Sequence, residues 1–250
     1  LLAVGVILLA TAISTIVRAS SSSSFTIDSF AKSLLENITP ENINENADDE
    51  LGYTRLHKAS FYGRLDIVEQ LVNQHKASVE VITNGSAEVF RTPLQVAAGR
   101  GHLEVVRFLM EQGKAEPEVL DNRQQSALWH AASNGHAAVA KYLLEETQHT
   151  RKAEANTENF QRVSPLLAAC ISGAHEVVNY LVNFDKTDID FRNVFGQTCL
   201  HLAAAGDNKT ALQSTLPAST FNHRKVAEII LSKKSDMIET VDGNEQTALF

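Results

Sequence analysis

Basic charge is in short supply in this sequence. Its 250 residues include 22 Lys and Arg against 30 Asp and Glu, which gives a formal net charge of −8 at pH 7. A surface that binds nucleic acid needs a basic stripe to displace counterions from the phosphate groups. The acidic balance therefore argues against DNA or RNA as a partner.

Cysteine and enzyme signatures are also scarce. The chain has two cysteines, too few for a disulfide-built scaffold, and they lack the CxxC spacing of a zinc site. No GxSxG, HExxH, P-loop, GxGxxG or EF-hand pattern is present. His130 and His175 have no Cys, Asp or Glu at ligand spacing on the same helix face. We therefore predict a chain that is not an enzyme and holds no catalytic site, cofactor or metal.

A long apolar run opens the sequence. LLAVGVILLATAISTIV carries no charge before Arg18 and approaches the length of a bilayer-spanning helix. It is interpreted either as an uncleaved membrane anchor flanked by Arg18 or as the apolar part of a secretory signal cleaved after Ala19. A third interpretation is an artefact of translating upstream sequence. Because position 1 is Leu and the first Met is Met110, we expect the reading frame to begin upstream.

The predicted localisation follows from this run. We favour membrane insertion through residues 1–17, with the rest of the chain in the cytoplasm. The alternative is secretion after cleavage near Ala19. Asn37, Asn84 and Asn208 begin Asn-x-Ser/Thr sequons, which are glycosylated only in a secretory compartment. A glycan at Asn84 or Asn208 would thus place the main part of the chain in a lumen or outside the cell.

Residues 1–19 form the hydrophobic segment, and residues 20–45 connect it to the main domain. The connection starts with a polyserine stretch, typical of a flexible linker. The next segment, FTIDSFAKSLLENI, has apolar side chains at helical spacing, and we expect a helix that caps the first turn of the main domain. Those apolar residues are Phe30, Leu34, Leu35 and Ile38.

A short pattern recurs through residues 46–250. Units open with the tetrads TRLH, TPLQ, SALW, SPLL, TCLH and TALF, at Thr54, Thr92, Ser126, Ser164, Thr198 and Thr247. Their spacing alternates between about 34 and about 38 residues, which indicates a solenoid. The last spacing is longer, and we predict that the extra segment from Asp207 to Phe221 is a loop inserted after Gly206.

Each unit follows the same physical pattern of two helices. The Thr or Ser caps the first helix by accepting hydrogen bonds from its free N–H groups, and Pro93 and Pro165 stand just inside, where no N–H is needed. Pairs of alanines keep the first helix thin so that neighbouring units can approach. A glycine then ends that helix, because a left-handed backbone costs glycine little. A second helix follows, with apolar residues at i, i+3 and i+4.

This pattern resembles the ankyrin repeat. NADDELGYT, from Asn46 to Thr54, matches the family's turn and helix entry, and GHLEVVRFLMEQG, from Gly101 to Gly113, matches its second helix. The resemblance covers residues 46–250 and includes about five full repeats and the start of a sixth. It implies an all-α solenoid of stacked helix-turn-helix units with protruding finger loops.

Histidines recur in equivalent positions of these units. His102, His136 and His223 begin second helices, whereas His57 and His201 share the last position of the tetrad. The resemblance implies that they make hydrogen bonds between fingers and helices rather than take part in chemistry.

The two cysteines fall in different positions of neighbouring repeats. Cys170 takes a small-residue position of one first helix, and Cys199 takes the proline position of the next. Stacked helices lie about 10 Å apart and the two positions differ by more than a helical turn, so the Cα atoms should exceed the bridging limit of about 7 Å. We predict two free thiols.

The resemblance implies a protein–protein interaction module that binds a protein or peptide on the concave surface of finger tips and first helices. Its variable positions include aromatic and Arg side chains, which often anchor interfaces. We predict partner contacts at Tyr53, Lys58, Tyr62, Arg91, Arg123, His130, Phe160, Phe195 and Gln197. Within this set, Tyr53, Tyr62, Phe160 and Phe195 are expected to form an exposed apolar stripe. The alternative is the recognition part of a larger enzyme, channel or ubiquitin-ligase adaptor.

Overall fold

The computed structural model describes residues 33–39, 42–45, 52–84, 90–147, 151–210 and 223–248. Residues 1–38 and 39–250 form two separate units. In the first unit, the described residues 33–37 form a short helical turn. The predicted hydrophobic segment 1–19, the polyserine linker and most of the predicted capping helix lie outside the described residues. Everything below concerns the second unit.

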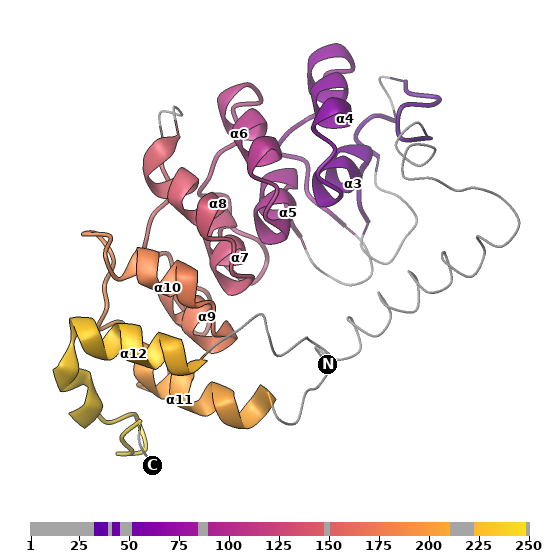
Figure 1. Cartoon of the computed structure of the whole chain (residues 1–250). Coiled ribbons are helices and arrows are strands. Elements are labelled where there is room, and N and C mark those ends of the chain that lie inside the picture. Colours follow the sequence, from indigo (N-terminus) through magenta and orange to yellow (C-terminus); the bar gives the residue numbers. More distant parts are fainter. Residues whose placement is uncertain are drawn as a thin grey trace, which may run out of the picture. The chain divides into compact units, whose positions relative to one another are not determined.

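The second unit is a row of helix pairs, one pair for each repeat (Figure 1). A short 3₁₀ helix, η3, follows the last pair, and the described residues contain no β-strand, only an isolated bridge between Val241 and Thr247. The predicted all-α solenoid of two-helix units is confirmed. The pairs are α3 (Arg55–Phe61) with α4 (Leu65–Glu69) and η1 (Gln70–Gln74), α5 (Pro93–Arg100) with α6 (Leu103–Glu111), α7 (Ala127–Ser133) with α8 (Ala137–Lys141) and η2 (Tyr142–Glu146), α9 (Pro165–Ser172) with α10 (His175–Leu181), and α11 (Cys199–Thr210) with α12 (His223–Lys233), before η3 (Ser235–Glu239).

Helices α3, α5, α7 and α9 begin where the sequence predicts, because each is capped by the hydroxyl of its tetrad. Thr54 and Thr92 accept from the N–H groups of His57 and Gln95, whose side chains in turn accept from the capping residue's N–H. Ser126 and Ser164 accept in the same way from the third helical residue. Such a cap stabilises a helix by about 1 kcal/mol, so the tetrads determine the helix starts locally.

Glycine ends the first helices for two separate reasons. Gly63 and Gly101 have positive φ angles of 67° and 77°, a region that other residues rarely adopt. In addition, a Cβ atom on Gly63 would lie 2.5 Å from Nδ1 of His102, and one on Gly101 would lie 2.5 Å from Nδ1 of His136. The histidine that begins the next repeat's second helix therefore packs directly on the glycine of the preceding repeat.

The core repeats with the same period as the sequence. First helices α3, α5, α7, α9 and α11 contact one another in chain order, and the second helices pack behind them. Alanines such as Ala97, Ala131 and Ala169 are fully buried where neighbouring first helices meet. Leucines at equivalent positions fill the space between the two layers and are also buried. These are Leu56, Leu94, Leu128, Leu166 and Leu200 in the first helices and Leu71, Leu109, Leu143 and Leu181 in the second.

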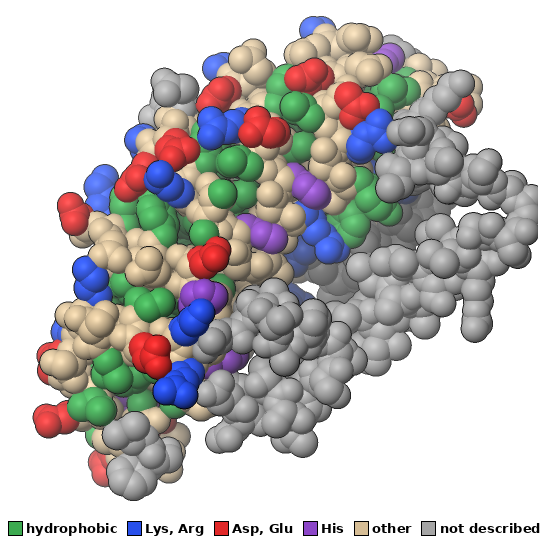
Figure 2. All heavy atoms as spheres, in the orientation of Figure 1, with side chains coloured by type: hydrophobic (Ala, Val, Ile, Leu, Met, Phe, Trp, Pro, Cys, Tyr) green, Lys and Arg blue, Asp and Glu red, His purple; other side chains and the backbone are tan. Residues whose placement is uncertain are grey.

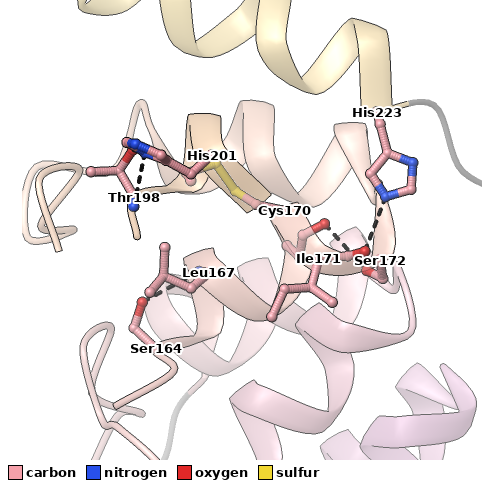
Figure 3. The surroundings of a disulfide bond; sticks show 10 residues. Ser164, Leu167, Cys170, Ile171, Ser172, Thr198, His201 and His223 are labelled. Atoms are coloured by element: carbon pink, nitrogen blue, oxygen red, sulfur yellow. Dashed lines mark hydrogen bonds between the residues drawn. A yellow bond between two sulfur atoms is a disulfide. The ribbon is translucent and has the colours of Figure 1, made fainter. Parts of the chain in front are cut away.

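The prediction of two free thiols is wrong. Cys170 in α9 and Cys199 in α11 form a disulfide, with their Cα atoms 5.4 Å apart (Figure 3). The prediction used the spacing of helices that carry large side chains. Here the facing positions hold small side chains, and the first residue of α11 lies beside the second turn of α9. The repeat register itself is unaffected, since Cys199 directly follows Thr198 at the predicted start of α11.

The inserted segment also differs from expectation. Helix α11 does not end at Gly206 but continues to Thr210. The predicted loop from Asp207 to Phe221 is therefore helical in its first part, and the rest of it, residues 211–222, lies outside the described residues. Because the helix continues through Gly206, this position does not form the left-handed turn that glycine provides in the other repeats.

Candidate interaction surface

A finger, the loop that leads into each first helix, is built around one Asp or Asn side chain. In finger 5, residues 193–197, Oδ1 of Asn193 accepts from the backbone N–H groups of Phe195 and Gln197, both at 3.0 Å. Its own N–H donates to the carbonyl of Gln197. Side chain and backbone thus close the loop and leave Val194 and Phe195 at its tip.

The same arrangement recurs in three other fingers, numbered by the repeat that each precedes. Asp121, Asn159 and Asp242 accept the equivalent backbone hydrogen bonds in finger 3 (121–125), finger 4 (159–163) and finger 6 (242–246). The sequence analysis did not predict this loop-closing Asp or Asn. The sequence does contain a pattern that would have revealed it, because each Asp or Asn lies at the same distance before the Thr or Ser that opens the tetrad.

Finger 2, residues 83–91, is the exception and is longer. Here Thr83 replaces the Asp or Asn: its hydroxyl accepts from the N–H of Arg91 at 3.0 Å, and its N–H donates to the carbonyl of Arg91. Residues 85–89 lie outside the described residues. The hydroxyl closes a wider loop than the carboxylate or amide does in the other fingers.

Four first helices, α3, α5, α7 and α11, also hold the finger that follows them. Nε2 of His57 lies 2.8 Å from the carbonyl of Arg91, and Nε2 of His201 lies 3.0 Å from that of Gln246. Gln95 performs the same task in its repeat by donating to the carbonyls of Val119 and Gln125. Trp129 donates through its indole N–H to the carbonyl of Val163. Fingers 2, 3, 4 and 6 are therefore held in place by the tetrads, as the resemblance implied for His57 and His201.

The protonation state of His57 follows from its surroundings. Burial lowers the pKa of His57 to about 4, against the smaller opposing effect of its hydrogen bond to the Arg91 carbonyl. The ring is therefore neutral at pH 7. Its Nδ1 accepts from the N–H of Thr54, so the proton lies on Nε2 and is donated to the finger.

Histidines at the start of the second helices bond in the opposite direction, to a backbone carbonyl in the first helix of the preceding repeat. Nε2 of His102 lies 3.0 Å from the carbonyl of Phe61, and that of His136 lies 3.2 Å from Gly99. His223 makes the equivalent contact with Ile171 at 3.0 Å (Figure 3). Histidine side chains appear at intervals along the stack in Figure 2. Their repeated role is structural, which agrees with the prediction.

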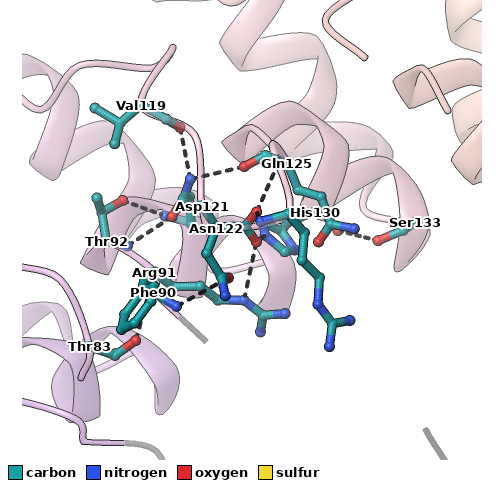
Figure 4. Close-up of polar contacts among 12 residues, drawn as sticks. Thr83, Phe90, Arg91, Thr92, Val119, Asp121, Asn122, Gln125, His130 and Ser133 are labelled. Atoms are coloured by element: carbon teal, nitrogen blue, oxygen red, sulfur yellow. Dashed lines mark hydrogen bonds and ion pairs between the residues drawn. The ribbon is translucent and has the colours of Figure 1, made fainter. Parts of the chain in front are cut away.

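His130 is the one predicted partner-contacting residue that the structure buries. Its side chain is 4% exposed, and its Nε2 lies 3.0 Å from Oδ2 of Asp121 (Figure 4). Burial lowers the pKa of His130 to about 4, so a neutral ring donates to an ionised carboxylate. Although burial by itself raises the pKa of Asp121, hydrogen bonds from His130 and the backbone lower it overall. His130 therefore braces finger 3 from inside, and its buried side chain offers little surface for the predicted partner contact.

The remaining predicted contact residues fall into two groups instead of one stripe. Tyr53, Lys58 and Tyr62 lie in and beside α3, where Phe61 contacts both tyrosine rings, whose centroids are 6.0 and 5.0 Å from its own. Phe160, Phe195 and Gln197 lie in fingers 4 and 5. The repeats of α5 and α7 stand between the groups.

Exposure distinguishes the residues of the second group. Phe160 is 65% exposed and Phe195 61%. Gln197 instead is half-buried, and its amide oxygen accepts from Asn193 within finger 5. The backbone N–H of Val194 donates to the carbonyl of Gln161, which joins the tips of fingers 4 and 5. The two phenylalanines are thus presented on neighbouring, connected tips.

Arg91 and Arg123 lie near the first group together with Arg100, which the sequence analysis did not single out. Arg100 is the last residue of α5, and its guanidinium lies 3.8 Å from the ring centroid of Phe61. The guanidinium of Arg91 approaches Asp121 at 3.9 Å. The signal for Arg100 was its position at the exposed end of a first helix, beside the aromatic side chains of the preceding repeat.

The described ranges contain neither a membrane-spanning helix nor a cluster suited to a metal ion. No described helix has both the length and the apolar character that crossing a membrane requires. Nor do three or more His, Cys, Asp or Glu side chains gather there in a way that could hold a metal ion.

Comparison with known families agrees with the geometry of the helix pairs and fingers. A model of three consecutive ankyrin repeats matches residues 79–153 and 148–240, and a single-repeat model matches residues 51–84. A comparison with curated proteins finds no match. The family models together cover most of the sequence and span the helices from α3 to η3. The chain belongs to the ankyrin repeat family.

Proposed function

We propose that the chain is a non-catalytic interaction module that binds a protein or peptide on its finger surface, defined as the finger tips and the exposed ends of the first helices. The observation that carries this proposal is the exposure of large apolar side chains on tips that are held by buried hydrogen bonds. Phe160 and Phe195 are examples. A surface ordered before binding loses little conformational entropy when a partner docks.

The side chains inside each finger support this proposal. The Asp and Asn side chains that close fingers 3, 4 and 5 are buried, whereas the tips are exposed. The tip residues therefore do not determine the finger's backbone, and their chemistry is available for a partner. Ankyrin repeats are generally protein–protein interaction modules, which agrees with fingers whose buried residues fix the backbone and whose exposed residues are free to contact a partner.

The test compares two variants of the full chain as affinity baits in an extract of the cells that make it. The double substitution Phe160→Ser and Phe195→Ser removes the exposed rings, and Ile238→Ser in η3 removes an exposed apolar side chain outside the fingers. We expect proteins captured by the wild type to be retained by Ile238→Ser and lost by the double variant. Both variants should unfold within about 0.5 kcal/mol of the wild type, because these side chains are exposed.

Two results of the bait experiment would contradict this proposal. If the double variant captures the same proteins as the wild type, or if no protein is captured specifically, the finger surface is not the binding surface. Tyr53 and Tyr62 are left unchanged in this test because they pack in the aromatic cluster around Phe61.

We also propose that the repeats reside in an oxidising compartment, which corresponds to the alternative of secretion after cleavage near Ala19. The Cys170–Cys199 disulfide supports this, because reducing compartments keep thiols reduced. The side chain of Asn84, within its sequon, is exposed and accessible to glycosylation. Peptide mapping of the natural protein under non-reducing conditions, before and after glycosidase treatment, tests both features. Free thiols together with an unglycosylated Asn84 would favour the cytoplasm instead.

A further inference from the structure

Three guanidinium groups from neighbouring repeats gather on the finger surface. Arg91 ends finger 2, Arg100 ends α5 and Arg123 lies in finger 3. Burial, followed by the like charge of Arg123, lowers the pKa of Arg91, although Tyr53 and Asp121 oppose these effects. Burial likewise lowers the pKa of Arg100, and the charge of Arg91 adds to this. Arg91 is thus close enough to repel both Arg100 and Arg123. The geometry agrees, because Nε of Arg91 lies 3.9 Å from Oδ2 of Asp121, whose Oδ1 accepts from the backbone N–H of Arg123.

The described residues supply little negative charge to this cluster. Asp121 is the carboxylate beside it, but its Oδ2 already accepts from His130 and its Oδ1 accepts from two backbone N–H groups. The Nε atom of Arg91 is buried and makes no hydrogen bond, although it forms a long ion pair of 3.9 Å with Asp121 (Figure 4). Arg100 and Arg123 have no carboxylate of the described residues within ion-pair distance. Among the described residues, the three cations thus share one buried counter-charge.

Arginines elsewhere in the stack differ from this cluster. Arg64 pairs with Asp66 at 2.7 Å, Arg162 with Glu158 at 3.2 Å and Arg224 with Glu228 at 3.1 Å. Arg107 pairs with Glu146 at 3.5 Å. Each of these four arginines has a carboxylate within 3.5 Å, whereas Arg91 reaches only the shared Asp121, at 3.9 Å. Arg192 differs again, because it donates to the backbone carbonyls of Gly196 and Val241.

We propose that these three arginines bind an acidic segment of a partner protein, with carboxylates at the guanidinium groups and an apolar side chain against Phe61 and Tyr62. This inference rests on the proposed interaction function and names the partner chemistry of one part of its surface. Arginine presents paired N–H donors that match a carboxylate, and its planar group packs well on aromatic rings. Phe61 and Tyr62 provide such rings beside Arg100.

The size of the cluster sets the size of the ligand. The three arginines belong to the repeats of α5 and α7, and Phe61 to that of α3. Three helices with small facing side chains, stacked at about 8 Å, span about 16 Å, which corresponds to about five residues of extended chain. A peptide is favoured over nucleic acid because a polyanion would also approach the excess negative charge of the rest of the protein.

The probe is a fluorescent peptide of repeated Glu-Glu-Phe units, titrated into the purified full chain at low salt. Two related peptides replace Glu by Gln or Phe by Ser, and an oligothymidylate of similar length tests general anion binding. We expect the Glu-Glu-Phe peptide to bind tightest, with an affinity that falls as salt is added because the contacts are between charges. Replacing Glu by Gln should weaken binding by about tenfold or more.

Matched variants locate the binding. The triple variant Arg91→Gln, Arg100→Gln and Arg123→Gln should lower peptide affinity by about tenfold or more. The control triple Arg224→Gln, Lys225→Gln and Lys233→Gln removes the same charge from α12 and should change affinity by about twofold or less. A third variant, with Lys at the three Arg positions, keeps the charge and should recover part of the affinity. Circular dichroism confirms that each variant is folded.

Two outcomes would overturn the proposal: equal losses in the two Gln triples, or an oligothymidylate that binds as tightly as the peptide. These outcomes are distinct from failure of the proposed function. If proteins captured in the bait experiment are lost by the Phe160 and Phe195 variant but retained by the Arg triple, the interaction function stands and acidic recognition fails. If the peptide binds at the arginines but no protein is captured in the bait experiment, acidic recognition stands and the proposed capture of a partner on the apolar finger tips fails.

Discussion

The finger surface has two chemically different regions on one repeated scaffold. The first, the basic region, consists of Arg91, Arg100 and Arg123, where Arg100 lies over the ring of Phe61 and burial lowers the pKa of Arg91 and of Arg100. The second, the apolar region, consists of the exposed Phe160 and Phe195 on fingers 4 and 5. Fingers 3 and 5 nevertheless close in the same way, through an Asp or Asn that accepts two backbone N–H groups.

The two regions show that the residues that close a finger and the residues exposed on its tip are different and can vary independently. The residues that close a finger are buried, so they can be kept while the tips change from cationic to aromatic. The basic region would provide orientation and salt-sensitive recognition, whereas the apolar region would provide buried area. What distinguishes the regions structurally is the reinforcement below them. A disulfide lies under the apolar region, and a buried histidine and carboxylate lie under the basic one.

Removal of the disulfide should have the largest effect and should act on the apolar region. Replacing Cys170 and Cys199 with Ala releases a loop with a sequence separation of 29 residues, and the chain-entropy estimate for such a loop is about 3.6 kcal/mol of stability. Because each repeat contacts only its neighbours, hydrogen exchange should increase in α9, α11 and fingers 4 and 5 more than in α3 and α5.

Chemical reduction provides the control for that prediction. A reductant should lower the unfolding midpoint of the wild type and leave the Ala variant unchanged. Equal loosening of both regions would show that the disulfide stabilises the stack as a whole and would remove this distinction between them.

Acidification should next weaken the basic end. His57 has a pKa of about 4 in the folded chain and an ordinary value of 6.5, so the unfolded state binds its proton first as pH falls. The stability contributed by the neutral ring is present above about pH 6.5 and is lost as pH falls toward 4, by about 2 kcal/mol between pH 7 and pH 5. His130 shifts in the same direction. Unfolding by urea across this pH range measures the loss.

The substitution His57→Gln isolates the contribution of that histidine. Gln95 already occupies the equivalent position in the next repeat, where it caps the helix and donates to the following finger. The variant should therefore keep most of the stability at pH 7 and lose less of it at pH 5 than the wild type. An unchanged pH dependence would assign the effect to other groups.

The smallest expected effect concerns a single finger. Asn193→Ala removes the acceptor for the N–H groups of Phe195 and Gln197, which should cost about 1 kcal/mol of stability. Asn193→Asp keeps the acceptor, as Asp121 does in finger 3, and serves as the control. Exchange of the Phe195 amide should accelerate in the Ala variant alone, while finger 3 is unaffected. If finger 3 also loosens, the fingers are coupled and the two regions are not independent.

Much of the scaffold could be predicted from short stretches of sequence. The helix starts at Thr54, Thr92, Ser126 and Ser164 follow from hydroxyls that cap the helix they precede. The role of His57 was predicted from its recurrence with His201. The candidate surface was harder to predict, because a variable position in the repeat does not reveal exposure. His130 occupies such a position and is buried, since Asp121 of its own finger reaches it.

The sequence by itself determined the period, the two-helix unit and its boundaries, because capping, glycine turns and apolar spacing act over a few residues. Only the tertiary structure decided which side chains from different repeats meet. The disulfide between α9 and α11, the separation of Tyr62 from Phe160, and the approach of Arg100 to Phe61 all depend on how closely first helices stack. That distance is set by the small side chains on both facing helices together, so neither repeat specifies it alone.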